Sequence, residues 1–259
     1  MKDKMLHQCL TMILICAINT KNVVAQDSTV AGRKWHFLVE PYLMFPNMNG
    51  STGLGGPPDA EVSESPGDVF KNLQFAAMLY AEARKGLWTF SSDFTYMALH
   101  SNVDEKNGAI VGDVKIKQVA WELAGMRSLS SWFELGLAFQ LNSIKSDVGM
   151  SVLIGGIPDV KTFDINQTWV DPSILARVKF DLSKKWFFQF RGNIGGGGIG
   201  SDLYWQLQSY FGYRMSKSFQ LSAGYRIIYI DYETGTSNDQ FVYNMTTFGP
   251  VLRFGFNVK

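Results

Sequence analysis

Cysteine is nearly missing from this sequence, and long apolar runs are missing beyond its first residues. Both cysteines, Cys9 and Cys16, lie close to the N-terminus. A mature chain that began after them would have neither disulfide bonds nor cysteine-ligated metals. Histidine is scarce too, since only His36 and His100 lie beyond residue 25, so we expect no metal site and no cofactor. Residues 26–259 lack an apolar run of the roughly 20 residues that a membrane-spanning helix needs.

Charge is also sparse and nearly balanced. Charged residues make up 18% of the chain, and its formal net charge is +1. Because nucleic-acid binding wants a basic face, this composition predicts no nucleic-acid partner. Aromatic residues, in contrast, are plentiful at 14%. If the chain is secreted, this composition predicts either a soluble β-protein or a transmembrane barrel.

The first 25 residues have the composition of a secretion signal. Lys2 and Lys4 precede an apolar core over residues 9–18, and Ala25 is a small residue that suits cleavage before Gln26. This core is shorter than the roughly 20 residues of a transmembrane helix. We therefore predict that residues 1–25 are a cleaved signal peptide and that residues 26–259 form a single domain.

Alternation of apolar and polar residues dominates the chain from Trp35 onward. In LQFAAMLYAEAR (73–84), the odd-numbered residues are apolar, whereas Gln74, Glu82 and Arg84 have the opposite parity. Comparable stretches lie at 35–45, 88–98, 117–126, 131–142, 173–182, 186–195, 202–213, 219–230 and 243–257. The pattern predicts an all-β fold, an up-and-down antiparallel transmembrane β-barrel of about 10 strands, with counts of about 8 to 12 also compatible.

The connections between these stretches alternate in length, as outer-membrane barrels require of periplasmic turns and external loops. Short connections lie at 84–86, 128–131, 183–185 and 215–218, and long ones at 46–70, 100–114, 143–171 and 231–241. In the first long connection, SPGDVFKN (65–72) has the cap and proline of a short helix. The connection 143–171 is apolar enough that we expect it to extend a hairpin beyond the membrane or to contact lipopolysaccharide or a partner.

The stretch GGGGIG (195–200) satisfies the G-x-G-x-x-G pattern of a dinucleotide-binding loop. That motif works only where a helix follows and presents its amides to the pyrophosphate. Here residues 202–213 alternate like a strand. We therefore expect a tight external hairpin and no nucleotide.

Several blocks of the second half carry a family resemblance: TWVDP (168–172), RVKFDLSKKW (177–186), RGNIGGGGIGSDLYWQ (191–206) and FGPVLRFGF (248–256). Through them the chain resembles a family of largely uncharacterised, porin-like outer-membrane β-barrel proteins of Gram-negative bacteria. The resemblance implies a place in the outer membrane, contact with its lipid and lipopolysaccharide, and insertion by the barrel-assembly machinery. It implies no established activity, and we expect a monomer.

Charged residues with inward parity separate into two groups along the chain. Acids lie mainly on the first half of the predicted wall and bases mainly on the second, with Arg84, Asp181 and Asp202 as exceptions. The main set is Glu40, Glu82, Asp93, Glu122 and Glu134, then Arg177, Arg191, Arg226 and Arg253. A barrel of this size is narrow, so these side chains should meet. We predict an ion-pair network that fills the lumen of a structural or surface-interaction barrel. The alternative is a charged constriction in a narrow passive channel for small polar solutes.

Aromatic residues open several strands just after the predicted periplasmic side. Trp35, Trp88, Trp186 and Phe219 have outward parity and similar depth. They predict an aromatic girdle at the level of the lipid headgroups.

Catalysis has few candidate residues in this sequence. His36 lies at the periplasmic start of the first strand, whereas His100 lies at an external strand end near Ser101, Asp104 and Glu105. Adjacent residues of a strand point to opposite faces, so a triad would need partners from other loops. We expect no catalytic residue and no enzyme, with an outer-membrane hydrolase centred on His100 as a further alternative.

Overall fold

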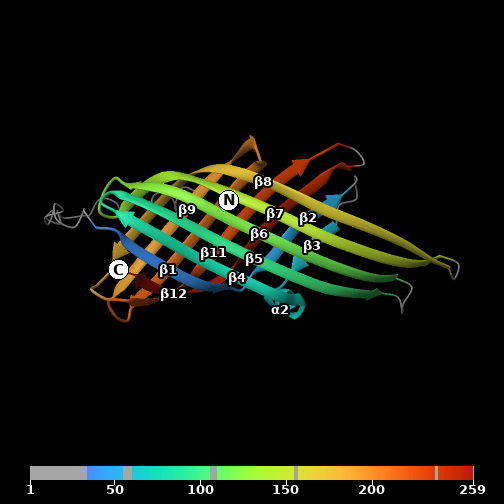
Figure 1. The fold of residues 1–259 in the computed structure, drawn as a ribbon, viewed down its shortest axis with the longest axis horizontal. Coiled ribbons are helices and arrows are strands. Elements are labelled where there is room, and N and C mark those ends of the chain that lie inside the picture. Colours follow the sequence, from blue (N-terminus) through green and yellow to red (C-terminus); the bar gives the residue numbers. More distant parts are fainter. Residues whose placement is uncertain (1–33, 55–59, 106–109, 155–156, 237–238, 259) are drawn as a thin grey trace, which may run out of the picture. The chain divides into compact units, whose positions relative to one another are not determined.

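The computed structural model describes residues 34–54, 60–105, 110–154, 157–236 and 239–258 (Figure 1). From Trp35 onward the chain forms one compact unit. The predicted signal peptide, residues 1–25, lies outside the described residues. No helix in the described part of the chain is long and apolar enough to cross a membrane.

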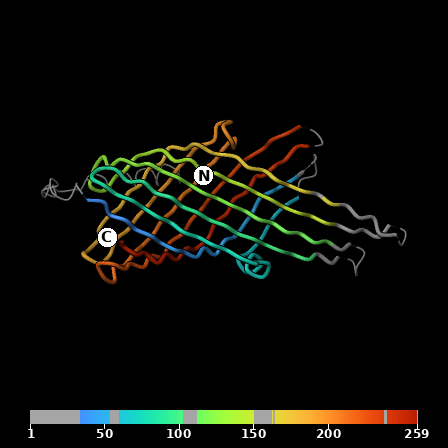
Figure 2. Tube along the Cα trace, viewed as in Figure 1, coloured from blue at the N-terminus to red at the C-terminus, as the bar shows by residue number. Residues whose placement is uncertain are grey.

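In the described residues, ten antiparallel strands close into an up-and-down barrel, because β1 pairs with both β4 and β12. Figure 2 traces this chain path. The strands are β1 (His36–Met44), β4 (Leu73–Lys85), β5 (Trp88–Glu105), β6 (Ile110–Ser128), β7 (Phe133–Ile154), β8 (Ile157–Asp181), β9 (Trp186–Ile199), β10 (Ser201–Arg214), β11 (Phe219–Thr234) and β12 (Phe241–Val258). The predicted fold class and strand number are confirmed.

The barrel has a short-turn end and a long-hairpin end, at the left and right of Figure 1. Tight turns join β4 to β5, β6 to β7, β8 to β9 and β10 to β11 at the first end. β7 and β8 stay paired over their whole length, from Phe133↔Val178 at the short-turn end to Ile154↔Ile157 at the other end. Most of the predicted loop 143–171 is therefore strand, and its interpretation as an extended hairpin is confirmed.

Two strands and a helix lie outside the closed barrel between β1 and β4. β2 (Asn47–Leu54) continues the direction of β1 along the far half of β12, and β3 (Ala60–Glu64) pairs with β2. The helix α2 (Pro66–Asn72) begins at the N-cap Ser65, whose side chain forms a capping box with Asp68. The predicted helix at 65–72 is thereby confirmed, and the predicted loop 46–70 contains a hairpin as well.

The glycine stretch forms the tight hairpin between β9 and β10. Gly196, Gly197, Gly198 and Gly200 have φ values of 94°, 72°, 83° and 79°, the left-handed region that favours glycine. A Cβ at Gly200 would lie 2.3 Å from the carbonyl oxygen of Val170. A strand follows where a nucleotide site would need a helix, so the prediction of a hairpin is confirmed.

Candidate functional site

The lumen is filled by two layers of different chemistry. Towards the short-turn end the inward side chains are charged and polar, and towards the long-hairpin end they are mostly apolar. We call the first layer the charge plug; it consists of Glu40, Glu82, Asp93, Glu122, Glu134, Arg177, Arg191, Arg226 and Arg253. The structure brings all nine of these sequence-predicted residues into ion pairs with one another.

Arg177 is the centre of the pairs nearest the short turns. Its guanidinium contacts Glu82 and Glu134, and its Nε donates to Glu134 at 2.6 Å. Arg84 adds a second cation 3.2 Å from Glu134. Thr89 donates to the same carboxylate at 3.0 Å. Glu134 is therefore paired and hydrogen-bonded on both oxygens, as a buried carboxylate must be.

Arg191 and Glu122 form the pair at mid-depth. They reach across the lumen from β9 and β6, and each side chain is 1% exposed. Asn193 donates to the second oxygen of Glu122 at 2.8 Å, and Gln206 donates to it at 3.3 Å. Arg191 pairs with one carboxylate oxygen of Glu122, and these two amides donate hydrogen bonds to the other oxygen.

Asp93 lies between two arginines, at 3.4 Å from Arg226 and 3.6 Å from Arg253. The hydroxyl of Tyr42 donates to Asp93 at 2.6 Å and accepts from Arg226 at 3.0 Å. Arg253 also pairs with Glu40 at 3.4 Å. This links the plug from β1 to β12, so it braces the strands that close the barrel.

Arg253 is surrounded by tyrosines that the sequence analysis did not single out. Its guanidinium carbon lies 4.2 Å from the ring centroid of Tyr210, 4.7 Å from that of Tyr80 and 5.2 Å from that of Tyr42. Aromatic faces attract a desolvated cation. The signal was present in the sequence, because these tyrosines share the inward parity of the charged residues.

Little space remains inside the charge plug. The gap lined by Glu40, Tyr80, Glu82, Lys179 and Arg253 has a volume of about 10 Å³. That is at the lower limit for a single water molecule. The packed arginines and tyrosines therefore leave little space in this gap.

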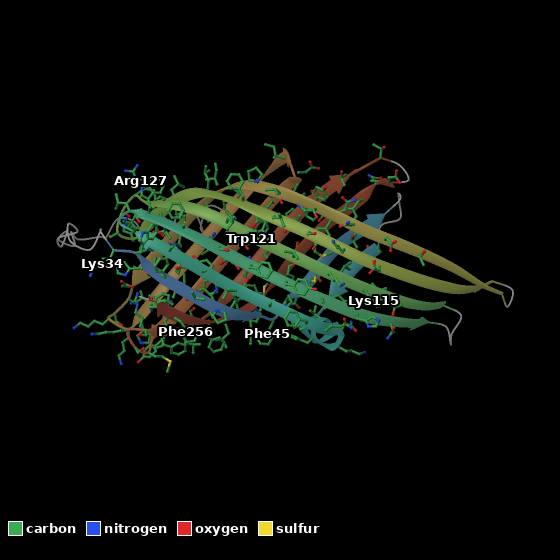
Figure 3. The ribbon with its side chains drawn as sticks, in the orientation of Figure 1. Lys34, Phe45, Lys115, Trp121, Arg127 and Phe256 are labelled. Atoms are coloured by element: carbon green, nitrogen blue, oxygen red, sulfur yellow. The ribbon has the colours of Figure 1, made fainter. Side chains whose placement is uncertain are left out.

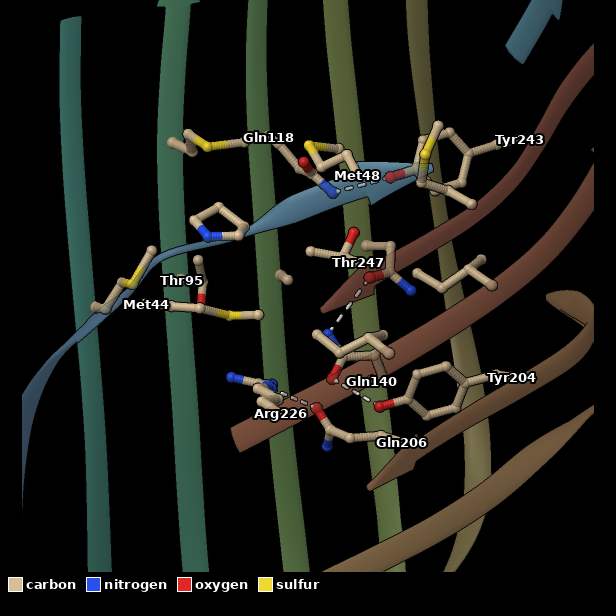
Figure 4. Close-up of a pocket in the computed structure, with 18 residues that line it drawn as sticks. Met44, Met48, Thr95, Gln118, Gln140, Tyr204, Gln206, Arg226, Tyr243 and Thr247 are labelled. Carbon is tan, nitrogen blue, oxygen red and sulfur yellow. Dashed lines mark hydrogen bonds between the residues drawn. The ribbon is translucent and has the colours of Figure 1, made fainter. Parts of the chain in front are cut away.

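The second layer is an apolar cavity of about 320 Å³, which we call the apolar chamber. Its side chains come from both walls of the barrel and from the hairpin and helix outside it. Its apolar lining includes Met48, Val62, Val69, Leu99, Val114, Ile116, Ile144, Ile165, Phe241, Tyr243 and Met245. A smaller cavity of about 70 Å³ lies between chamber and plug, and Figure 4 shows its lining of methionine and amide side chains.

The chamber was missed by the sequence analysis, although the sequence carries a signal for it. Along the far halves of β6 and β7 the alternation is inverted: Lys115, Lys117 and Lys145 face outward and are exposed, whereas Ile116 and Ile144 face the lumen. The inversion hides these segments from a search for strands with an apolar outer face. It also marks where the apolar band on the outer face of the wall ends.

The residues predicted to form the aromatic girdle all face away from the lumen. Trp35, Trp88 and Trp186 are exposed, and Phe219 is half-buried with its ring 5.2 Å from that of Phe256. Arg127 lies 5.8 Å from the ring centroid of Trp88. Figure 3 shows Arg127 and Phe256 near the short-turn end and Lys115 towards the long hairpins. Their role at the headgroups stays a prediction.

His100 lies on the outward face, beyond the apolar band. Its Nε2 is 2.7 Å from Asp113 and its Nδ1 is 3.2 Å from the amide of Gln74. Hydrogen bonds from His100 and Lys115 hold the pKa of Asp113 below its ordinary value. Ser101 lines the apolar chamber on the opposite face. The structure thus pairs His100 with a carboxylate that the sequence analysis did not name, on the other side of the wall from Ser101.

Solved structures of outer-membrane barrels resemble this one, whereas no family model and no curated protein sequence matches the chain. The outer membrane protease OmpT of Escherichia coli has a TM-score of 0.55 and 8% identity, covering 90% of this chain and 100% of that one. Neisserial surface protein A has a TM-score of 0.32 and 14% identity, with coverages of 87% and 96%. Ail of Yersinia pestis has a TM-score of 0.30 and 10% identity, with coverages of 87% and 99%. The likeness to OmpT shows the fold alone, which is that of an outer-membrane β-barrel.

Proposed function

We propose that the protein is a monomeric barrel of the outer membrane of a Gram-negative bacterium, with a lumen closed by the charge plug and a structural or surface-interaction role. The short turns then face the periplasm and the long hairpins face outward. The observation that carries the proposal is the plug itself, in which nine charges, eight of them buried and Glu82 half-buried, are paired across the lumen. Its residual gap of about 10 Å³ favours the closed barrel rather than the alternative of a passive channel.

The outer surface supports the membrane location. Large apolar side chains with outward parity are exposed around the barrel, including Phe90, Leu123, Leu137, Ile174 and Phe211. In water such a continuous band would be costly, whereas in lipid it is favoured. Lipid and lipopolysaccharide are therefore the partners of this surface, and the barrel-assembly machinery inserts the chain.

No catalytic role is part of the proposal. His100 and Asp113 form a pair on the outward face, and Ser101 lies on the lumen side of the wall. A Ser–His mechanism needs the two side chains within hydrogen-bond reach. The protruding β7–β8 hairpin and the segment β2–β3–α2 are the parts through which the barrel would contact other molecules.

Closure of the lumen is tested by ion conductance in planar lipid bilayers. We expect wild type to be silent, and the double variant Glu122→Ala/Arg191→Ala to conduct because it empties the middle of the plug. The matched control is Asp181→Ala/Arg214→Ala, which removes an ion pair whose carboxylate is 65% exposed and should stay silent. Steady conductance of wild type would contradict the closed lumen and favour the passive channel.

Location and orientation are tested with peptide tags on intact cells. A tag between Ile154 and Ile157, at the tip of the β7–β8 hairpin, should bind antibody without permeabilisation. A tag in the turn between β8 and β9 should bind only after the outer membrane is opened. The reverse pattern would contradict the orientation, and labelling of neither site without cell disruption would contradict the surface location.

A further inference from the structure

The apolar chamber has the size and lining of a ligand site. An engineered apolar cavity of about 150 Å³ holds one benzene molecule, and ligand pockets start at about 300 Å³. The chamber has about 320 Å³, with Leu99, Ile144 and Met245 on its walls. Apolar walls bind water poorly, because water needs several polar partners. A molecule about the size of a bicyclic aromatic would gain by replacing weakly held solvent.

The charges around the chamber select against an anionic ligand. Its charged lining residues are two acids at the outer rim, Glu64 and Asp68, and none of its described lining residues is basic. Among the lining residues, Gln118 donates to Tyr243 at 3.3 Å. Because this amide already has a partner, it offers no strong site for a charged head group.

The wall beside the chamber has a seam where two strand edges fail to meet. β1 pairs with β4 only up to Pro41↔Leu79, although β4 begins at Leu73. Beyond that point the chain follows β12 as β2 and returns as β3, which has β2 as its one partner among the described strands. We define the seam as the gap between β3 (Ala60–Glu64) and residues 73–78 of β4.

The helix α2 covers this seam. It connects β3 to β4 and packs against β3 and β5. Val69 is 3% exposed and lines the chamber, whereas Phe70 is 43% exposed and its ring lies 5.5 Å from that of Phe45. One short helix therefore separates the chamber from the barrel's outer surface. In Figure 1 it lies at the edge of the barrel, beside the point where β1 ends.

The seam lies at the outer margin of the apolar band. Phe70 of α2 is exposed, as are Phe45 beside it and Phe75 in the strand that follows. Lys115 and Lys117 are the exposed outward residues at a similar level of β6. Figure 3 shows Phe45 close to α2 and Lys115 nearer the long hairpins. An apolar molecule dissolved in the membrane would reach α2 directly from the lipid.

We propose that the apolar chamber binds one small, uncharged apolar molecule, such as a bicyclic aromatic hydrocarbon, and that this molecule enters sideways through the seam when α2 moves. This adds a ligand site to the proposed barrel and does not depend on whether the plug conducts. The lateral path would give a molecule dissolved in the membrane a route to the chamber that does not pass the charge plug.

Binding is tested with 1-bromonaphthalene as the probe and detergent-solubilised, refolded protein. Equilibrium gel filtration measures the probe that migrates with the protein above the micelle baseline, and anomalous scattering from crystals locates the bromine. Leu99→Trp fills the chamber and should weaken binding by about tenfold or more. Val62→Trp fills it from the hairpin outside the closed barrel, so it keeps the test valid if Leu99→Trp fails to fold.

The matched control is Leu137→Trp, the same exchange at an outward residue that is 59% exposed. It should bind like wild type, with about one probe per barrel. A bromine peak between Leu99 and Ile144 would support the site. Equal probe uptake by all four proteins would show partition into micelles only and would overturn the proposal. No uptake by wild type would overturn it as well.

Selection by charge is tested with the anion 6-bromo-2-naphthoate. It should bind about tenfold more weakly than the neutral probe, and equal binding of the two probes would overturn the selection by charge.

The lateral path is tested by fixing α2 to the wall. A disulfide in Phe45→Cys/Phe70→Cys, made in a chain whose own cysteines are only Cys9 and Cys16, should slow probe association by about tenfold while the dissociation constant changes little. Reduction should restore the rate. Equal association rates of the oxidised and reduced forms would show that the probe does not pass through the seam.

Discussion

At the scale of single residues, the mid-depth pair of Arg191 and Glu122 carries the largest energetic consequence. Both side chains are 1% exposed, and neither can turn to water if its partner is lost. A buried charge without its partner is strongly destabilising, whereas replacing both members by apolar side chains is often neutral. The pair is therefore expected to act as a unit.

Arg191→Met should lower the free energy of unfolding by about 3–5 kcal/mol, because Glu122 would stay buried without a cation. Glu122→Leu/Arg191→Met should cost less than the single exchange. Urea unfolding in lipid vesicles measures both. Arg214→Met is the control, since its partner Asp181 is 65% exposed and an exposed pair contributes at most about 1 kcal/mol. Equal losses for Arg191→Met and Arg214→Met would contradict a buried, interdependent plug.

The cap of α2 predicts a pH dependence outside the membrane. The Ser65 side chain donates to Asp68 at 2.5 Å and its backbone N–H donates at 3.1 Å, which lowers the pKa of Asp68. A lowered pKa in the folded state means that the cap stabilises α2 above the carboxyl's unfolded pKa and is lost as the pH falls through the folded value. Amide exchange in α2, corrected for its intrinsic rate, should therefore accelerate below about pH 4. In Asp68→Asn this acceleration should vanish; its persistence would assign the effect to another group.

At the scale of elements, the β7–β8 hairpin separates what the barrel needs from what projects beyond it. Ser146 and Ile165 are opposite each other in register. Removing residues 147–164 would thus shorten both strands equally above the apolar band. We expect this variant to fold, with wild-type heat-modifiable migration in gel electrophoresis.

A one-residue deletion in the same strand should be far more harmful. Without Ile174, the preceding part of β8 would change parity, and Trp169 and Asp171 would turn from the lumen to the lipid. The prediction is failed assembly by the same gel assay. If the deletion of Ile174 folded and that of 147–164 did not, the depth assigned to this hairpin would be wrong.

The alternation of the sequence predicted the strand segments whose outer face is apolar. It did not predict the segments whose outer face is charged. Strands such as β9 and β10 keep mostly apolar residues outward, so the alternation predicts strands at residues 186–195 and 202–213. The far halves of β5 to β8 have water outside and an apolar chamber inside, so their parity is reversed. They were expected to be loops at 100–114 and 143–171. Strand pairing over these segments is a tertiary feature, because each extension is held by its neighbour's extension.

Parity predicted which charged residues face the lumen. It could not predict which acid pairs with which arginine, nor where the barrel wall has its seam. Parity placed Glu122 and Arg191 inward, but which acid meets which arginine depends on the stagger of strands across the barrel. The tyrosines around Arg253 depend on the same geometry, whereas the pairing of His100 with Asp113 depends on the register of the neighbouring strands β5 and β6. The seam depends on where β1 stops pairing with β4, after Pro41, while the chain continues along β12 into β2.

At the scale of the whole molecule, the barrel is one wall that passes through two environments. Along the apolar outer band, the lumen is filled by the charge plug. Beyond that band the outer face carries exposed lysines, and the lumen holds the apolar chamber. Strand β6 contains both patterns, with Leu123 outward in the apolar band, Lys115 outward above it, and Ile116 in the chamber.

The most direct test of this two-layer account is the collision accessibility of single nitroxide spin labels on β6, in bilayers, to oxygen and to a water-soluble nickel chelate. Labels at Leu123→Cys, Lys115→Cys and Ile116→Cys sample lipid, water and chamber on one strand. We predict contact with oxygen but not the chelate at 123, strong contact with the chelate at 115, and weak contact with the chelate at 116. Equal chelate contact at 115 and 116 would mean that water fills the outer lumen, and the account would be wrong.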